Sequence, residues 1–167
     1  MAVSLTATAK SATANTYISL SDANSYLDGT PNDDTWDAAT DDQKNRALKS
    51  ATDRLEQMEW VSTVTDSDQR LAWPRLAISD RDGRDFDQDA IPRPIEEAAA
   101  ELARRIIDGS YTSDDTGLEG FASVKVGSLS VTPRSSRKAA KLPEAVRLIV
   151  QPYAKGLDEL TVPLSRG

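Results

Sequence analysis

The sequence contains neither cysteine nor histidine among its 167 residues. Without cysteine, no disulfide bond, thiol nucleophile or cysteine-based zinc site can form. Without histidine, the commonest general base at neutral pH is missing. Any catalysis would have to depend on carboxylates, lysine, tyrosine, serine or threonine. We therefore expect a protein that is not an enzyme, with no catalytic residues, no cofactor and no metal ion.

Long hydrophobic runs are also missing from the chain. The chain has no stretch of about 18 apolar residues, which is the length needed to span a membrane. Met1–Lys10 lacks the basic region and the apolar stretch of a secretory signal. Hydrophobic residues make up 38% of the chain and charged residues 28%, which is typical of a soluble globular protein. We expect one domain that is made in the cytoplasm and has no membrane partner.

Charge is unevenly spread along the chain, whose net charge is −7. From Phe121 onward there are eight Lys/Arg against three Asp/Glu, a balance of +5, so the part up to Gly120 carries −12. Proteins that bind nucleic acid usually present a basic face. Only the C-terminal region could therefore attract a phosphate backbone.

Two capping signals predict helices in the first half of the chain. Ser19 followed by Asp22 is typical of a helix start, and Gly29 would end this short helix. Thr40 followed by Gln43 begins a longer helix. Its apolar residues recur at steps of three and four, which places them on one helix face: Ala47, Leu48, Ala51, Leu55 and Met58.

Proline and glycine delimit the elements of the second half. Ile91–Pro94 begins a second long helix that ends at Gly109, and Pro143 begins a last short helix whose length is limited by Pro152. Between these helices, Ala122–Val131 alternates imperfectly and predicts a strand or hairpin.

The predicted fold class is mainly α. We expect a small helical bundle with a short β-strand or hairpin element and extended flexible N- and C-terminal arms. The predicted division is a flexible N-terminal arm at residues 1–15, a helical domain at 16–153 and a C-terminal partner-binding tail at 154–167.

An acidic run is the one cluster that resembles a metal site: Asp80, Asp82, Asp85, Asp87 and Asp89. An EF-hand loop needs glycine at its sixth position and an acid at its twelfth. Counted from Asp80, Gly83 is fourth and Ile91 twelfth. We therefore interpret the run as a solvated turn.

The three tryptophans could stack on the bases of single-stranded DNA. Trp36 and Trp60 flank the best-predicted helix, and Trp73 precedes a proline, which favours packing in a small core instead. Trp73, Pro74 and Arg75 are expected to form a structural motif, because Pro74 favours an extended Trp73.

Two segments near the C-terminus are candidate binding sites. A basic patch could contact phosphates or an acidic partner, or could equally be a flexible linker; no aromatic residue is interleaved in it. It consists of Arg134, Arg137, Lys138 and Lys141. The tail carries apolar residues at short intervals and fits a hook that adds to another chain, with a frayed end as the alternative. These residues are Leu157, Leu160, Val162 and Leu164.

Several short stretches, in this order and spacing, resemble one family of phage proteins. They are Asn15–Ala23, Ala47-Leu48 with Ala51-Thr52, Leu71–Arg75, Asp80–Gly83, Ala90–Pro92, Glu96–Ala103 and Val124–Leu129, which together cover roughly residues 15 to 153. The family is that of tailed-phage head–tail connector (adaptor) proteins, whose members often carry the label DnaT-like single-stranded-DNA-binding protein.

The resemblance implies a structural virion protein of the head–tail neck. Its subunits would form a dodecameric ring under the portal protein and contact neighbouring copies of themselves. Below the ring would lie a neck (stopper) or tail-terminator protein, and DNA would pass through the hole without specific binding. The resemblance further implies that Leu157–Leu164 grips the portal. An acidic channel would let DNA slide without sticking.

Two other functions remain to be compared with this one. A single-stranded-DNA-binding replication helper would need a continuous basic groove with stacking aromatics, against which the −12 balance argues. A carboxylate-dependent hydrolase would need paired acids in an apolar pocket, and no motif indicates them.

Overall fold

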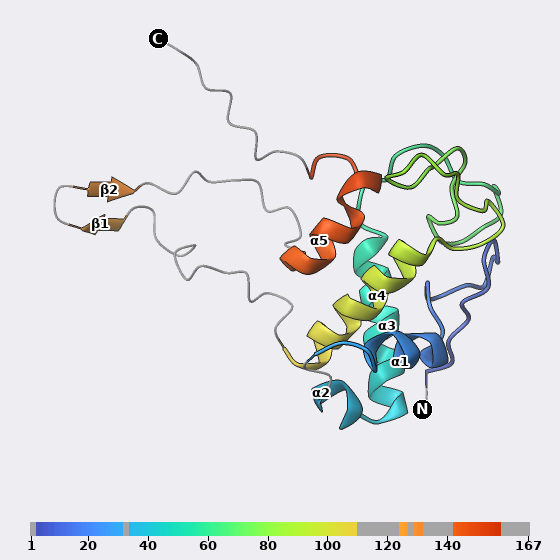
Figure 1. Ribbon diagram of the computed structural model, residues 1–167. Coiled ribbons are helices and arrows are strands. Elements are labelled where there is room, and N and C mark those ends of the chain that lie inside the picture. The colour runs from blue at the N-terminus through green and yellow to red at the C-terminus, as the bar shows by residue number, and fades with distance from the viewer. Residues whose placement is uncertain (1–2, 32–33, 110–123, 127–128, 132–141, 158–167) are drawn as a thin grey trace, which may run out of the picture.

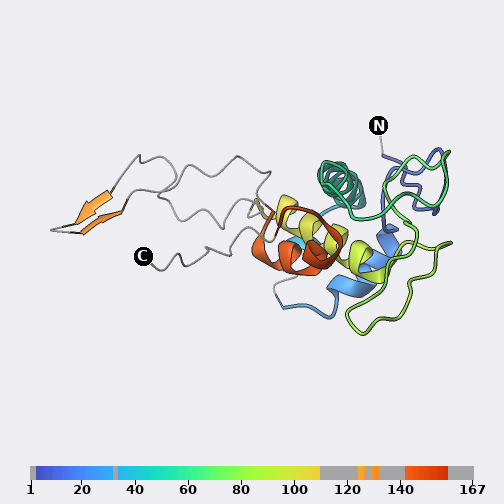
Figure 2. The same cartoon turned by 90° about the horizontal axis from the view of Figure 1, so that it is seen from above.

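Helix α4 (Arg93–Ile107) lies at the centre of the helical body, where α1, α2, α3 and α5 contact it (Figures 1 and 2). Its start follows from proline, since Pro92 is the N-cap and Pro94 lies in the first turn, where an amide hydrogen is not needed. Most of its buried residues are small and let the neighbouring helices approach closely. The buried residues are Ile95, Ala98, Ala99, Ala100, Glu101, Leu102 and Ala103.

The computed structural model describes residues 3–31, 34–109, 124–126, 129–131 and 142–157. Within these residues the protein is mainly helical, which confirms the predicted class. The helices besides α4 are α1 (Leu20–Leu27), α2 (Asp34–Asp37), α3 (Asp41–Leu55), α5 (Glu144–Val150) and the 3₁₀-helix η1 (Gln151–Tyr153).

Helix α3 packs along α4 through the apolar face that its sequence predicts. Thr40 and Gln43 form a complete capping box, in which the side-chain oxygen of each residue accepts a hydrogen bond from the backbone amide of the other. Four apolar residues of this face are buried: Ala47, Leu48, Ala51 and Leu55. The helix ends at Leu55, one turn earlier than the predicted stripe, which ran to Met58.

The shorter elements follow the predicted signals. In α1, the Ser19 hydroxyl accepts a hydrogen bond from the Asp22 amide at 3.1 Å, and α5 begins directly after Pro143. Strands β1 (Val124–Val126) and β2 (Leu129–Val131) pair antiparallel, with Val126 opposite Leu129. The hairpin therefore lies within the predicted segment. Helix α2 was not predicted.

A long irregular segment, residues 56–92, connects α3 to α4 and is held together by polar contacts. Arg75 donates hydrogen bonds to three backbone carbonyls, those of Val61 (2.7 Å), Ala72 (2.9 Å) and Ser62. Arg75 follows a buried Trp73 and a cis Trp73–Pro74 peptide bond. The Arg75 guanidinium thus ties together the backbone at residues 61, 62 and 72 of this segment.

The stretch that precedes α1 lies against the helical body. The Asn15 side chain accepts from the Thr6 amide at 2.8 Å and donates to the Ser4 carbonyl at 2.9 Å. The Val3 amide donates to Asp42 of α3 at 3.2 Å, and Leu5 packs against the core. Backbone and small polar groups make most of these contacts. A search of the sequence for large apolar residues therefore did not predict them.

Candidate nucleic-acid interface

The tryptophans are core residues and present no face on which a base could stack. Trp36, Trp60 and Trp73 are 0%, 5% and 1% exposed. Trp60 and Trp73 meet edge to face with ring centroids 5.5 Å apart, and Tyr153 continues the cluster 6.1 Å from Trp73. Phe86 also packs against Tyr153, with ring centroids 5.6 Å apart. The packing role predicted for the tryptophans is confirmed.

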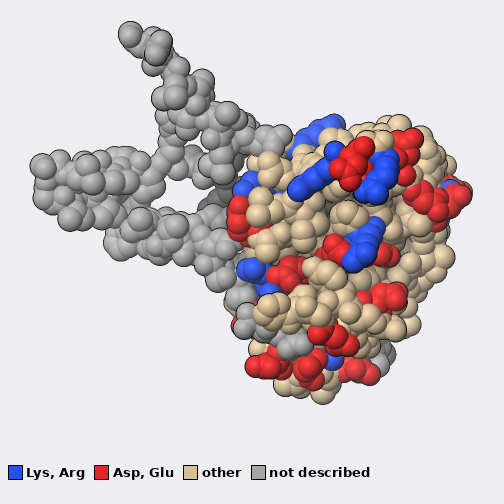
Figure 3. Space-filling view, viewed as in Figure 1, with Lys and Arg blue, Asp and Glu red and all other residues tan. Residues whose placement is uncertain are grey.

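Most cations of the described body are already paired with acids. Many of these pairs join residues three or four positions apart on one helix, such as Lys49 with Asp53 and Arg93 with Glu97. Lys44 is buried and lies 5.3 Å from the centre of the Trp36 ring. Figure 3 shows acidic and basic side chains interspersed over one face, with no continuous basic stripe.

Three exposed cations of the described residues have no carboxylate within ion-pair distance: Arg70, Arg81 and Lys155. Arg81 comes from the acidic turn before α4 and donates to the Leu148 carbonyl of α5 at 3.1 Å. Lys155 follows η1 and is held in place by a 2.7 Å hydrogen bond from its backbone amide to the Glu59 carbonyl. Fold contacts thus bring together two cations that are far apart in sequence.

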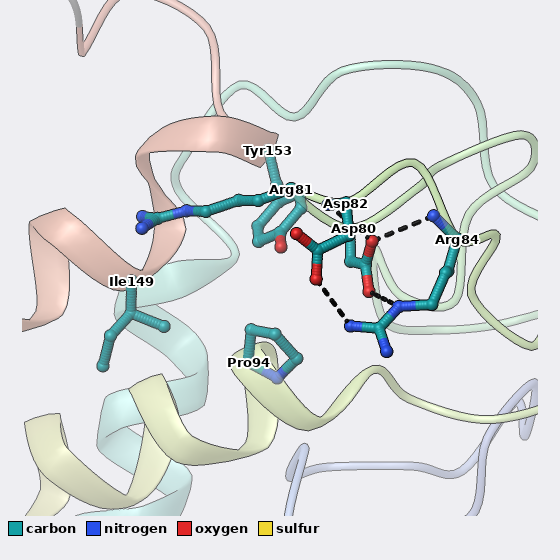
Figure 4. A pocket seen from close by; sticks show the side chains of 7 residues that line it. All are labelled: Asp80, Arg81, Asp82, Arg84, Pro94, Ile149 and Tyr153. Carbon is teal, nitrogen blue, oxygen red and sulfur yellow. Dashed lines mark hydrogen bonds and ion pairs between the residues drawn. The ribbon is translucent and has the colours of Figure 1, made fainter.

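Arg81 borders two hollows on the surface. The smaller has a volume of about 280 Å³, and its apolar wall is formed by Pro94, Ile149 and Tyr153 (Figure 4). The larger, about 640 Å³, is lined by Arg81 and Lys155 together with Val61, Gln151, Pro152, Ala154 and Gly156. We call these two the Arg81 hollows. Each of them is bordered by at least one cation without a described carboxylate partner and by several apolar residues.

The acids beside the smaller hollow are engaged by Arg84. Asp80 accepts from Arg84 Nε at 2.7 Å and Asp82 from Arg84 Nη2 at 2.9 Å (Figure 4). Backbone amide hydrogen bonds from Arg84 and Asp82, with the Arg84 guanidinium, hold the pKa of Asp80 below its usual value. Burial raises the pKa of the Tyr153 hydroxyl, Arg81 opposes this rise and Asp80 adds to it.

This acidic turn shows no arrangement for a metal ion. Within the described part of the chain, no three acidic side chains are grouped as metal ligands. Gly83 has a φ of +79°, a conformation that glycine adopts readily and that suits a turn within the acidic run. In the same part of the chain, no helix is long and apolar enough to cross a membrane.

The two C-terminal candidate sites lie largely outside the described residues. This holds for the whole basic patch, Arg134, Arg137, Lys138 and Lys141, and for Leu160, Val162 and Leu164 of the tail. Leu157 is described, and it is half-buried and packs against the core of its own chain. Ala154 is 6% exposed and pairs with Trp60 in an isolated antiparallel bridge.

Sequence reasoning missed Arg81, Lys155 and Tyr153 as parts of one site. Arg81 lies within the acidic run that was interpreted as a solvated turn, and Lys155 lies within the predicted C-terminal tail. The sequence gives no signal for these cations, because acids follow both of them at helical spacing: Asp85 is four residues after Arg81, and Asp158 is three residues after Lys155. Only the structure shows that Arg81 is not paired with a described acid.

The fold and surface together define a small, mainly helical protein with a locally basic hollow on an acidic body. The whole chain, residues 1–167, matches the family described as "Putative DnaT-like ssDNA binding protein". The chain belongs to this family. Neither the curated proteins nor the solved structures include a significant match.

This family corrects the function expected from the sequence. The expectation of a structural head–tail connector is wrong, because the family description names single-stranded DNA binding. No comparison supports a virion, adaptor, neck or portal-binding protein. The acidic balance does not exclude DNA binding, since exposed charges more than about 8 Å apart are largely screened at physiological salt. The local potential near Arg81 and Lys155 therefore depends little on acids farther away than this.

Proposed function

We propose that the protein binds single-stranded DNA through its phosphate backbone and catalyses no reaction. The observation that carries this proposal is the match of the entire chain to the single-stranded-DNA-binding family. Two features of the chain support it: the positive balance after Phe121, and the pair of unpaired cations at the Arg81 hollows.

The mode of binding follows from which groups are exposed. Because the tryptophans are buried, base stacking on them cannot supply the affinity, and contacts to phosphates must supply most of it. Such contacts release counterions, so affinity falls steeply as salt rises, by about 0.7 logarithmic units per phosphate and per tenfold salt. We expect binding that is salt-sensitive and depends little on base sequence.

The basic patch, Arg134, Arg137, Lys138 and Lys141, is the largest cluster of positive charge in the sequence. It directly precedes Leu142, which leads into α5 and from there to Lys155. In the sequence, only Leu142 and Pro143 separate Lys141 from Glu144, the first residue of α5. A strand held by the patch could therefore continue onto the body.

The test is a binding titration of a fluorescent oligodeoxythymidine with the full chain between about 50 and 200 mM salt. Replacing all four patch residues by glutamine should weaken binding and reduce the salt slope by up to about three units. A matched control replaces four ion-paired cations of the body by glutamine, Lys10, Arg46, Lys49 and Arg93. It changes the net charge equally and should retain most of the slope.

No binding by the unaltered chain at about 50 mM salt would refute the proposed function. Equal losses in the two variants would show that the net charge, and not the patch, governs the interaction.

A further inference from the structure

The Arg81 hollows have the shape and chemistry of a subsite for a short piece of a single strand. The smaller hollow, about 280 Å³, has an apolar wall formed mainly by Pro94 and Ile149, to which Tyr153, only 5% exposed, adds little surface. A nucleobase has a flat apolar face and polar edges, and hollows of roughly 300 Å³ upward hold small organic ligands. This hollow is therefore of a size for one base.

Arg81 and Lys155 lie where the phosphates of a nucleotide would lie if its base occupied the smaller hollow. Arg81 borders both hollows, and Lys155 borders only the larger one. Arg81 uses one nitrogen, Nη2, for the Leu148 carbonyl, and a guanidinium has five N–H donors. Donors thus remain for a phosphate oxygen without breaking the contact that positions the side chain.

The surrounding charges favour a phosphodiester at this place. Asp80 and Asp82, the acids nearest to the smaller hollow, are paired with Arg84, so their charge is partly compensated. On the other side, Gln151, Pro152, Ala154 and Gly156 line the larger hollow and bring no acid to it. The larger hollow is therefore the locally positive part of an acidic body.

We propose that Arg81 and Lys155 bind two successive phosphates of a single DNA strand, with one base in the hollow lined by Pro94, Ile149 and Tyr153. This inference rests on the proposed single-stranded-DNA binding and deepens it. The strand runs from the smaller hollow over Arg81 and across the larger hollow to Lys155. Only an unpaired base can enter the smaller hollow, because a duplex buries its base faces in the stack. The subsite thus accounts for a preference for single strands without an exposed aromatic platform.

The first test is the salt dependence of oligodeoxythymidine binding by the full chain carrying Arg81→Gln and Lys155→Gln. Loss of two phosphate contacts should lower the salt slope by about 1.4. The matched control carries Lys49→Gln and Arg93→Gln, which also remove one lysine and one arginine charge, both from ion pairs on exposed helix faces. The slope of the control should stay that of the unaltered chain.

The second test needs no substitution. An oligonucleotide that carries 5-iododeoxyuridine is photo-crosslinked to the unaltered chain, and the crosslinked peptides are identified by mass spectrometry. We expect a crosslink in the peptide that contains Tyr153, and its loss when the oligonucleotide is annealed to its complement.

The outcomes separate this inference from the proposed function. If the unaltered chain binds but the slope is the same in the Arg81/Lys155 variant and the control, or no crosslink reaches the Tyr153 peptide, the subsite is refuted while DNA binding stands. If the unaltered chain does not bind DNA at all, the proposed function fails and the subsite with it.

Discussion

Replacing Glu56 by alanine should destabilise the protein, because this carboxylate joins three separate segments. Glu56 caps the C-terminal end of α3. It accepts a hydrogen bond from the hydroxyl of Tyr17, a residue that precedes α1. It also accepts from the Ala72 amide nitrogen, which lies 3.0 and 3.2 Å from the two carboxylate oxygens. Alanine leaves both donors without their acceptor.

The expected magnitude follows from those two donors. A buried donor that loses its partner costs about 1–3 kcal/mol, so Glu56→Ala should lower the free energy of unfolding by roughly 2–5 kcal/mol. Glutamine keeps one acceptor oxygen and removes the charge. We expect Glu56→Gln to lie within about 1 kcal/mol of the unaltered chain at neutral pH.

The pH dependence separates the charge of Glu56 from its hydrogen bonds. Burial raises the pKa of Glu56, against the opposing effects of the Ala72 amide, Arg75 and Arg70. An acid whose folded-state pKa is raised contributes stability below its unfolded pKa, and this contribution is lost as the pH rises through the folded pKa. Glu56→Gln removes this contribution. The unaltered chain should therefore lose stability relative to Glu56→Gln as the pH rises from about 4 to 7.

The assay is urea unfolding followed by tryptophan fluorescence, which reports the core because all three tryptophans are buried. It would be run on the unaltered chain and both variants at acid and neutral pH. The reasoning would be refuted if Glu56→Ala were as stable as the unaltered chain, or if glutamine cost as much as alanine.

Two further predictions concern local backbone signals. Thr40→Ala removes the capping box of α3 and should cost about 1 kcal/mol in urea unfolding, whereas Thr40→Ser should cost little; an equal cost for both would mean that the cap is not the cause. Gly83→Ala should lower the free energy of unfolding by about 1–2 kcal/mol, because Gly83 has a φ of +79°. Nothing lies within 4 Å of the added methyl group, so the whole effect comes from backbone strain. An unchanged thermal midpoint would contradict this.

The helices were predictable because their signals are local. Ser19 and Thr40 each bond to an amide within one turn, and Pro92 and Pro94 act through their own φ angles. Helix α2 was missed because its four residues contain a single buried apolar side chain, Trp36, too few to show a period. Its tryptophan is instead held by a 2.9 Å hydrogen bond to Asn24 of α1.

The candidate site was predictable only in its parts. The acidic turn and its glycine were evident, and so was the positive balance of the C-terminal region. The position of Arg81 and Lys155 at one hollow could not be predicted. It depends on the packing of α5 against α4 and on the hydrogen bond from Arg81 to the Leu148 carbonyl. Hydrogen bonds to a backbone carbonyl leave no trace in residue identity.

Residue order alone specifies where α1, α3, α4 and α5 begin, that α4 ends near Gly109, and which faces of α3 and α4 are apolar. All of these depend on neighbours along the chain, whose separation is set by helix geometry. Only the folded chain shows that Trp73 packs edge to face against Tyr153 and that Arg81 and Lys155 border one hollow. These features depend on long-range packing, and for that reason the cations available to a phosphate could be identified only in the folded chain.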